Sequence, residues 1–147
     1  MTVRELALAF DTLYPRELSC EWDNDGLLLS PDPDREVHRI LTVLDVTERV
    51  VNAAKENGFD VIISHHPLIF RPLKSAVLGE GIGGLAASLI TSGISLLSYH
   101  TRADAADGGV ADLLARLVGL SEVVPFADGI PRIGKLRTPI SSRELAE

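Results

Sequence analysis

The sequence contains a single cysteine, Cys20, and no long apolar run. One cysteine excludes an internal disulfide, and a chain without disulfides suits the reducing cytoplasm. No apolar run reaches the ~20 residues that a membrane-spanning helix needs. The first residues lack the basic start and apolar core of a signal peptide. We therefore expect a cytoplasmic protein with no membrane partner.

Basic residues are scarce as well: 14 Lys and Arg stand against 21 Asp and Glu, which gives a net charge of −7. Duplex binding relies on clustered Lys and Arg against phosphates, and no stretch of this chain concentrates them. The balance therefore argues against a broad nucleic-acid surface. It leaves open a small basic site for a phosphorylated small molecule. The length of 147 residues and the apolar content of 46% fit one globular domain.

Apolar runs and helical patterns alternate along most of the chain. Strands and helices are predicted in turn at 40–44, 47–57, 61–63, 82–92, 94–97 and 107–117. A capping box of Thr2 and Glu5 predicts an N-terminal helix that Pro15 ends, and short strands are expected at 27–29 and 123–124. The βαβ order implies right-handed crossovers. The predicted fold class is α/β, a three-layer sandwich with a mostly parallel central sheet and helices on both faces.

Histidines follow two of these strands at the edge where an open parallel sheet binds ligands. His65 and His66 follow strand 61–63, His100 follows strand 94–97, and Asp104 lies four residues further on. Imidazole together with carboxylate suits Zn²⁺, Mn²⁺ or Fe²⁺. We predict that His65, His66 and Asp104 bind a divalent metal. We assign His100 a catalytic role, in which it orients a ligand or transfers a proton.

The adjacency of the two histidines also predicts how they are used. Neighbouring residues in an extended chain point to opposite sides, and Pro67 biases His66 toward that conformation. The two rings would then bind different ions ~3.5–4 Å apart, with Asp104 as a bridge. The alternative is that the pair is only a polar loop and that His100 is a structural histidine.

Three blocks of the sequence resemble the family of NGG-interacting-factor-three homologues, many of which are labelled type 2 GTP cyclohydrolases. They are Glu21–Leu27 (EWDNDGL), Ser64–Phe70 (SHHPLIF) and His100–Asp104 (HTRAD). The resemblance implies a hexameric toroid with two divalent ions (Zn, Mn or Fe) in each complete site. Their ligands would include His65, His66 and Asp104, with His100 close by. It further implies a metal-dependent hydrolase that acts on a nucleotide or a related phosphorylated heterocycle.

The resemblance also implies a further His and Glu ligand near the C-terminus of a longer chain. No histidine follows His100 in this sequence. We therefore expect residues 1–128 to form the α/β metal-site domain and residues 129–147 to begin a second segment that is truncated or absent. A non-catalytic metal-binding scaffold or regulatory interaction protein is the alternative function.

Several weaker signals have structural interpretations. The glycine pattern of 79–84 matches a dinucleotide-binding loop, but a flexible loop before a helix is favoured because no strong strand precedes it. Cys20 is expected to be inert packing rather than a nucleophile, and Trp22 to anchor a turn. Asp23 and Asp25 are interpreted as a solvated acidic turn.

Overall fold

A four-stranded sheet forms the centre of the computed structural model, which describes residues 1–146. Its strands lie in the order β1 (Gly26–Leu29), β4 (Ser95–Ser98), β3 (Val61–Ser64) and β2 (Ile40–Val43). β2, β3 and β4 run parallel, whereas β1 pairs antiparallel with β4, so that Gly26 lies opposite Ser98. The prediction of a mostly parallel sheet is confirmed.

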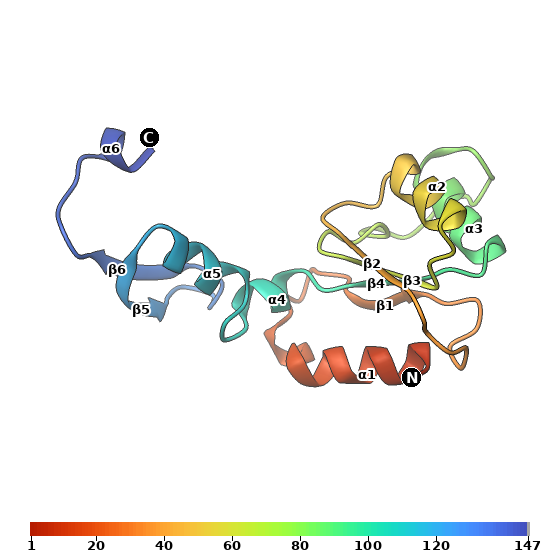
Figure 1. Cartoon of the computed structure of the whole chain (residues 1–147), viewed down its shortest axis with the longest axis horizontal. Coiled ribbons are helices and arrows are strands. Elements are labelled where there is room, and N and C mark those ends of the chain that lie inside the picture. The colour runs from red at the N-terminus through yellow and green to blue at the C-terminus, as the bar shows by residue number, and fades with distance from the viewer. Residues whose placement is uncertain (147) are drawn as a thin grey trace.

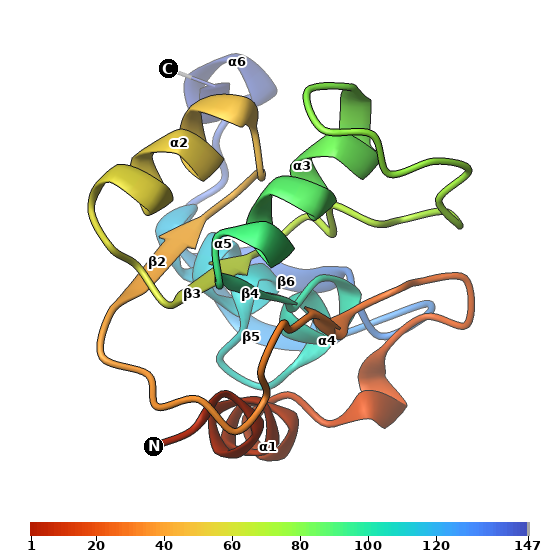
Figure 2. The same ribbon diagram turned by 90° about the vertical axis from the view of Figure 1, so that its right-hand side faces the viewer.

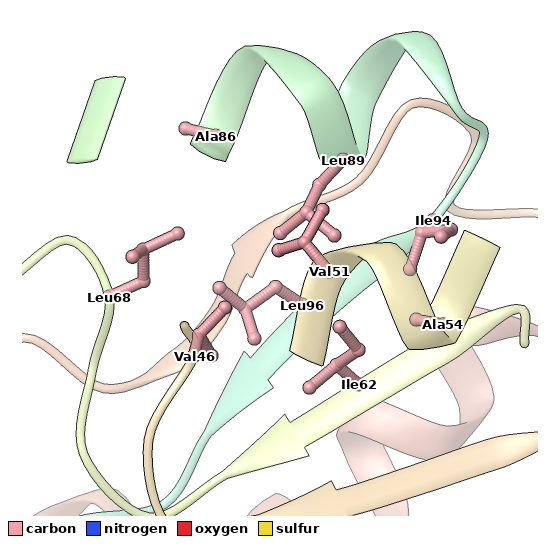
Figure 3. Packing of buried hydrophobic residues seen from close by; sticks show 9 residues of the cluster. All are labelled: Val46, Val51, Ala54, Ile62, Leu68, Ala86, Leu89, Ile94 and Leu96. Atoms are coloured by element: carbon pink, nitrogen blue, oxygen red, sulfur yellow. The ribbon is translucent and has the colours of Figure 1, made fainter. Parts of the chain in front are cut away.

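Helices cover both faces of this sheet (Figures 1 and 2). α1 (Val3–Leu13) lies on one face, while α2 (Glu48–Glu56) and α3 (Gly81–Thr91) lie on the other. Alternate strand residues serve the two faces: Ile63 and Leu97 pack toward α1, and Ile62 and Leu96 pack toward α2 and α3 (Figure 3). Because side chains alternate along a strand, the all-apolar strands indicated a sheet buried on both sides. The three-layer sandwich is confirmed.

Local sequence signals account for where the helices begin and end. Thr2 and Glu5 form the expected capping box at the start of α1, and α1 ends before Pro15. The Thr47 side chain accepts a hydrogen bond from the backbone N–H of Val50 at the start of α2. Gly58 follows α2 with a positive φ of 64°, a conformation that costs glycine little.

The glycine pattern at 79–84 serves packing. No strand lies directly before it, because β3 ends at Ser64 and residues 65–80 contain no strand, and α3 begins inside the pattern at Gly81. A Cβ atom on Gly83 would lie 1.8 Å from the carbonyl oxygen of Ser75, and one on Gly84 would lie 2.5 Å from that of Val77. The glycines therefore let the loop before α3 pack directly on the helix, which explains the pattern without a dinucleotide.

The C-terminal part of the chain lies to one side of the sheet (Figure 1). It comprises α4 (Thr101–Ala105), α5 (Val110–Leu117), the antiparallel strands β5 (Leu120–Pro125) and β6 (Arg132–Leu136), and α6 (Ser142–Ala146). The sequence predicted α5 and part of β5, but neither α4 nor β6. The domain boundary expected at residue 129 falls in the turn between β5 and β6 and stays a prediction. A 3₁₀ turn, η1 (Arg16–Leu18), follows α1. None of the helices in residues 1–146 combines the length and the apolar character needed to cross a membrane.

Candidate metal centre

Side chains from the ends of several strands meet at one edge of the sheet. His65 and His66 follow β3, and His100 follows β4, so the parallel strands deliver all three to the same edge. One ring nitrogen from each lies within 4.8 Å of the others. Because β1 runs antiparallel to β4, its beginning lies at this edge too, and the segment before Gly26 joins the cluster. The predicted convergence at the carboxyl edge is therefore observed.

His65 and His66 contribute to one cluster, although the sequence predicted that they point to opposite sides. Their ring centroids are 5.0 Å apart. The prediction was wrong because the strand ends at Ser64 and the chain bends at both histidines. Their backbone N–H groups donate to the carbonyls of Val43 and Leu44, at 3.1 and 2.9 Å, which holds this bend against the end of β2.

Asp104 lies at the border of the cluster. It stands in α4, where its backbone N–H donates to the carbonyl of His100. Its Oδ1 is 3.6 Å from Nε2 of His65, and both side chains are about one-fifth exposed. The helical turn between His100 and Asp104 thus places the carboxylate against the histidine that follows the neighbouring strand. Its role as a metal ligand stays a prediction.

Asp23 holds His100, which contradicts the prediction of a solvated acidic turn. Its side chain is fully buried, and its Oδ1 lies 3.0 Å from Nδ1 of His100. Asp23 also accepts hydrogen bonds from the backbone N–H and the hydroxyl of Thr101. Burial by itself would raise the pKa of Asp23, but the hydrogen bonds from Thr101 and His100 lower it below its ordinary value.

The ionised state of Asp23 fixes the tautomer of His100. A carboxylate only accepts hydrogen bonds, so Nδ1 of His100 carries the proton that Asp23 binds. Nε2 is then the ring nitrogen left to face the cluster. A buried carboxylate that orients an imidazole in this way is typical of metal-ligating and proton-transferring histidines.

A second carboxylate, Asp45, was missed by sequence reasoning. Asp45 follows the end of β2, and its Oδ1 lies 2.8 Å from Nδ1 of His66. It therefore does for His66 what Asp23 does for His100. Its position in the sequence could have identified it, because Asp45 is an acidic residue just beyond a parallel strand, at the same edge of the sheet as the histidines.

A buried arginine supports the segment that carries Asp23. Arg102 is 1% exposed and lies between Asp11 of α1, at 2.8 Å, and Asp25, at 3.1 Å. Burial raises the pKa of Asp25, which the charge of Arg102 opposes and the charge of Asp23 reinforces. Asp25 is thus a buried ion-pair partner rather than part of a solvated turn. The pair ties the start of β1 to α1 and α4.

Trp22 does not anchor the turn as predicted, because its side chain is 61% exposed. Its ring lies edge-on to Phe70, with centroids 6.0 Å apart, and edge-on to His100, at 6.3 Å. Cys20 is half-buried, and its backbone N–H donates to the hydroxyl of Thr101. Its position helps to hold the segment that precedes β1, and its role as packing rather than nucleophile stays a prediction.

The donor set fits a divalent transition metal. Two carboxylates orient two imidazoles, a third imidazole lies beside them, and Asp104 adds a negative charge. Nitrogen ligands at about 2.0–2.1 Å from one ion lie at most ~4 Å from each other. The observed spread of up to 4.8 Å therefore requires the rings to close by about 1 Å on a single ion, or to share two adjacent ions.

Comparisons with known proteins agree with the resemblance found in the sequence. A family model described as Duf34/NIF3 (NGG1p interacting factor 3) matches residues 1–147. A GTP cyclohydrolase 1 type 2 homolog of Streptomyces coelicolor is 34% identical over 151 residues, which cover 97% of this chain and 53% of that protein. A Staphylococcus aureus protein of the same name is 41% identical over 123 residues, which cover 84% of this chain and 33% of that protein.

Two solved structures share the fold. A Bacillus cereus protein related to NIF3 is 38% identical with a TM-score of 0.79, over 86% of this chain and 35% of that one. Reduced HcgD from Methanocaldococcus jannaschii is 30% identical with a TM-score of 0.83, over 91% of this chain and 54% of that one. The chain thus spans between one-third and about half of the length of the relatives that it matches.

Proposed function

The chain belongs to the Duf34/NIF3 (NGG1p interacting factor 3) family, and we propose that its histidine cluster binds divalent metal and hydrolyses a nucleotide or a related phosphorylated heterocycle. The observation that carries the proposal is the cluster itself. Three imidazoles lie within 4.8 Å of one another, and two of them are oriented by carboxylates. The proposed metal ligands are His65, His66 and Asp104.

A divalent ion bound here would supply hydroxide at neutral pH, because it lowers the pKa of bound water to about 7. His65 and Asp104 face each other across 3.6 Å and would hold the ion from two segments. Neutral imidazoles bring no charge, so Asp104 would be the single anionic ligand against about two positive charges per ion. We therefore propose that this chain alone holds about one ion firmly. A second ion would need further carboxylate ligands.

His100 is proposed to act on the substrate rather than only on the metal. Nδ1 is committed to the buried carboxylate of Asp23, so Nε2 is free to accept a proton. A base whose second nitrogen is fixed by a carboxylate keeps its orientation while its proton moves. His100 would thus orient the substrate and transfer a proton beside the ion.

The substrate class rests on the relatives. Those from Streptomyces coelicolor and Staphylococcus aureus carry the name GTP cyclohydrolase 1 type 2 homolog. By family resemblance we also propose a homo-oligomer, a hexameric toroid. Large apolar side chains on α5 support association: Leu113, Leu114 and Leu117 are more than half exposed. Light scattering of the purified chain tests this part separately.

A metal-binding scaffold without turnover is the second candidate. It is favoured by the small number of negatively charged groups that could bind an ion. Asp45 and Asp23 already contact the Nδ1 atoms of His66 and His100, which leaves Asp104 as the carboxylate beside the cluster. A scaffold would bind metal and leave nucleotides unchanged. A hydrolase would do both.

One experiment separates the two. The chain is freed of metal with a chelator, reloaded with Zn²⁺, Mn²⁺ or Fe²⁺, and incubated with GTP while products are separated by chromatography. The hydrolase predicts metal-dependent product, which His65→Ala abolishes together with bound metal. His100→Ala should abolish product and leave most of the metal bound. Metal binding without product in all three metals would establish the scaffold.

A further inference from the structure

We propose that Trp22 and Phe70 form a platform on which a planar heterocycle stacks, and that its anionic group binds in the neighbouring pocket around Arg71 and Lys74. The inference rests on the proposed function, because it takes the histidine cluster as the centre at which the substrate reacts. It assigns each part of that substrate to particular residues of this chain.

The platform consists of two exposed aromatic rings at the edge of the site. Trp22 is 61% exposed and Phe70 is 42% exposed, whereas Tyr99 in the same region is buried in the core. The two rings contact each other edge-to-face with centroids 6.0 Å apart. Aromatic rings that stay in solvent can pair with a further ring in an offset-stacked or edge-to-face arrangement.

The two loops that carry the platform are joined by a hydrogen bond. The side-chain amide of Asn24 donates to the backbone carbonyl of Ile69. Asn24 lies two residues after Trp22 and Ile69 lies directly before Phe70, so this bond joins the two loops close to both rings. The hydrogen bond between Asn24 and Ile69 thus sets the relative position of the two rings, which do not have to be buried to keep that position. Both rings remain partly exposed in this arrangement.

The platform also reaches the histidine cluster. The Trp22 ring lies 6.3 Å from the ring of His100, and the ring of His100 lies 5.2 Å from that of His65. Phe70 comes four residues after His66, in the loop that leaves β3. A heterocycle stacked on Trp22 would therefore lie next to the groups proposed to bind metal and transfer a proton.

Charge decides on which side of the platform an anionic group binds. Phe70 lines a pocket of about 480 Å³ that contains Arg71, Lys74 and one carboxylate, Glu80. Trp22 lines a different pocket of about 600 Å³ whose charged residues are all acidic: Glu17, Glu21, Asp107 and Asp128. An anion is repelled from the second pocket and attracted to the first.

Arg71 and Lys74 are free to bind that anion. Within residues 1–146, neither forms an ion pair with a carboxylate, although the chain carries an excess of acidic side chains. Two unpaired cations beside an aromatic platform match a ligand that carries both a flat aromatic ring and a phosphate. The combination fits a nucleotide better than a sugar phosphate, which lacks the aromatic ring, or a free base, which lacks the phosphate charge.

Trp22 is the only tryptophan of the chain, so its fluorescence reports directly on the platform. The test titrates the metal-free chain with guanosine 5′-monophosphate, guanosine and ribose 5-phosphate, with excitation at the red edge where nucleobases do not absorb. The nucleotide should quench Trp22 saturably. Guanosine should bind about tenfold more weakly, and ribose 5-phosphate should produce no quenching.

Variants assign the two halves of the ligand. Phe70→Ala should weaken nucleotide binding about tenfold, the effect expected for loss of one stacking partner. Its control is Phe126→Ala, which removes another half-exposed phenylalanine. Lys74→Ala should weaken the nucleotide but not guanosine, with Lys135→Ala as its control. Because Trp22→Ala removes the fluorophore, the nucleotide affinity of that variant is measured by calorimetry.

The results separate this inference from the proposed function because no metal is present in the titration. Saturable quenching that Phe70→Ala and Lys74→Ala weaken supports the platform even where no hydrolysis is found. Equal nucleotide affinity in the wild-type chain and Phe70→Ala, or no saturable quenching at all, overturns the platform. Either result would leave metal-dependent hydrolysis to be judged by its own assay.

Discussion

Asp45→Asn tests whether His66 is a metal ligand that a carboxylate holds in place. In the structure Oδ1 of Asp45 lies 2.8 Å from Nδ1 of His66, and the two side chains are 57% and 48% exposed. Asparagine keeps the shape and can still accept a hydrogen bond from Nδ1, but it brings no charge. The substitution therefore removes the electrostatic contribution to the basicity of His66 and leaves the geometry nearly unchanged.

The expected effect is a loss of metal affinity without a loss of folding stability. Removal of such an outer partner costs 10–100-fold in metal affinity at typical sites. Solvent screens this half-exposed pair, so we expect the lower end, about tenfold or about 1.4 kcal/mol. The free energy of unfolding of the metal-free chain should change by less than about 0.5 kcal/mol, since exposed positions contribute little to the core.

Calorimetric titration with Zn²⁺ and thermal unfolding without metal measure the two quantities. The matched control is Asp34→Asn, because Asp34 is an exposed aspartate that pairs with Arg4. The control should leave metal affinity unchanged. Unaltered affinity in Asp45→Asn would refute the assigned role of the carboxylate. A sharp drop in melting temperature with constant affinity would make the pair structural.

Three further substitutions probe buried charges, two of them beside the site and one, Asp60, at the opposite end of β3. Asp23→Asn should lower metal-dependent product formation, leave most of the metal bound and cost about 1–3 kcal/mol of stability, because the buried Asp23 side chain holds His100; the GTP assay, a metal titration and denaturant unfolding check these three outcomes. Arg102→Met should cost about 3–5 kcal/mol by denaturant unfolding, because it leaves the buried carboxylate of Asp25 unpaired. Burial raises the pKa of Asp60, but hydrogen bonds from two backbone N–H groups and a nearby arginine outweigh it and lower the pKa below its ordinary value of 3.8. A lowered carboxyl pKa stabilises the fold above that value and the contribution is lost as the pH falls below it, so Asp60→Asn should make unfolding less acid-dependent below about pH 4. If the stability of Asp60→Asn fell with pH below about 4 as strongly as that of the wild-type chain, this assignment would be contradicted.

The sequence was sufficient to predict the sheet, its layers and the place of the three histidines. Apolar strands that alternate with helices imply a parallel sheet, and residues just after parallel strands share one edge. His65, His66 and His100 followed directly from that rule. Their side-chain directions did not, because the chain bends at His65 and leaves the strand geometry on which the prediction relied.

The carboxylates of the site were harder to predict. Asp23 precedes β1, and only the antiparallel pairing of β1 with β4 brings it beside His100. The order of elements along the chain does not specify this pairing. The exposure of Trp22 was missed for another reason: a tryptophan in a turn is usually buried when the turn packs on a core. α4 was missed because its five residues are too few for a helical period to be detected.

Metal binding by the histidine cluster can be measured by a Zn²⁺ titration of the chelator-treated chain beside its His65→Ala variant. His65 is the histidine that faces Asp104, and its strand-end position contributes little to either core cluster. We expect saturable binding of about one ion per wild-type chain and none in the variant, with unchanged thermal unfolding of the two metal-free proteins. An absence of saturable binding in the wild-type chain, or equal binding by His65→Ala, would contradict it.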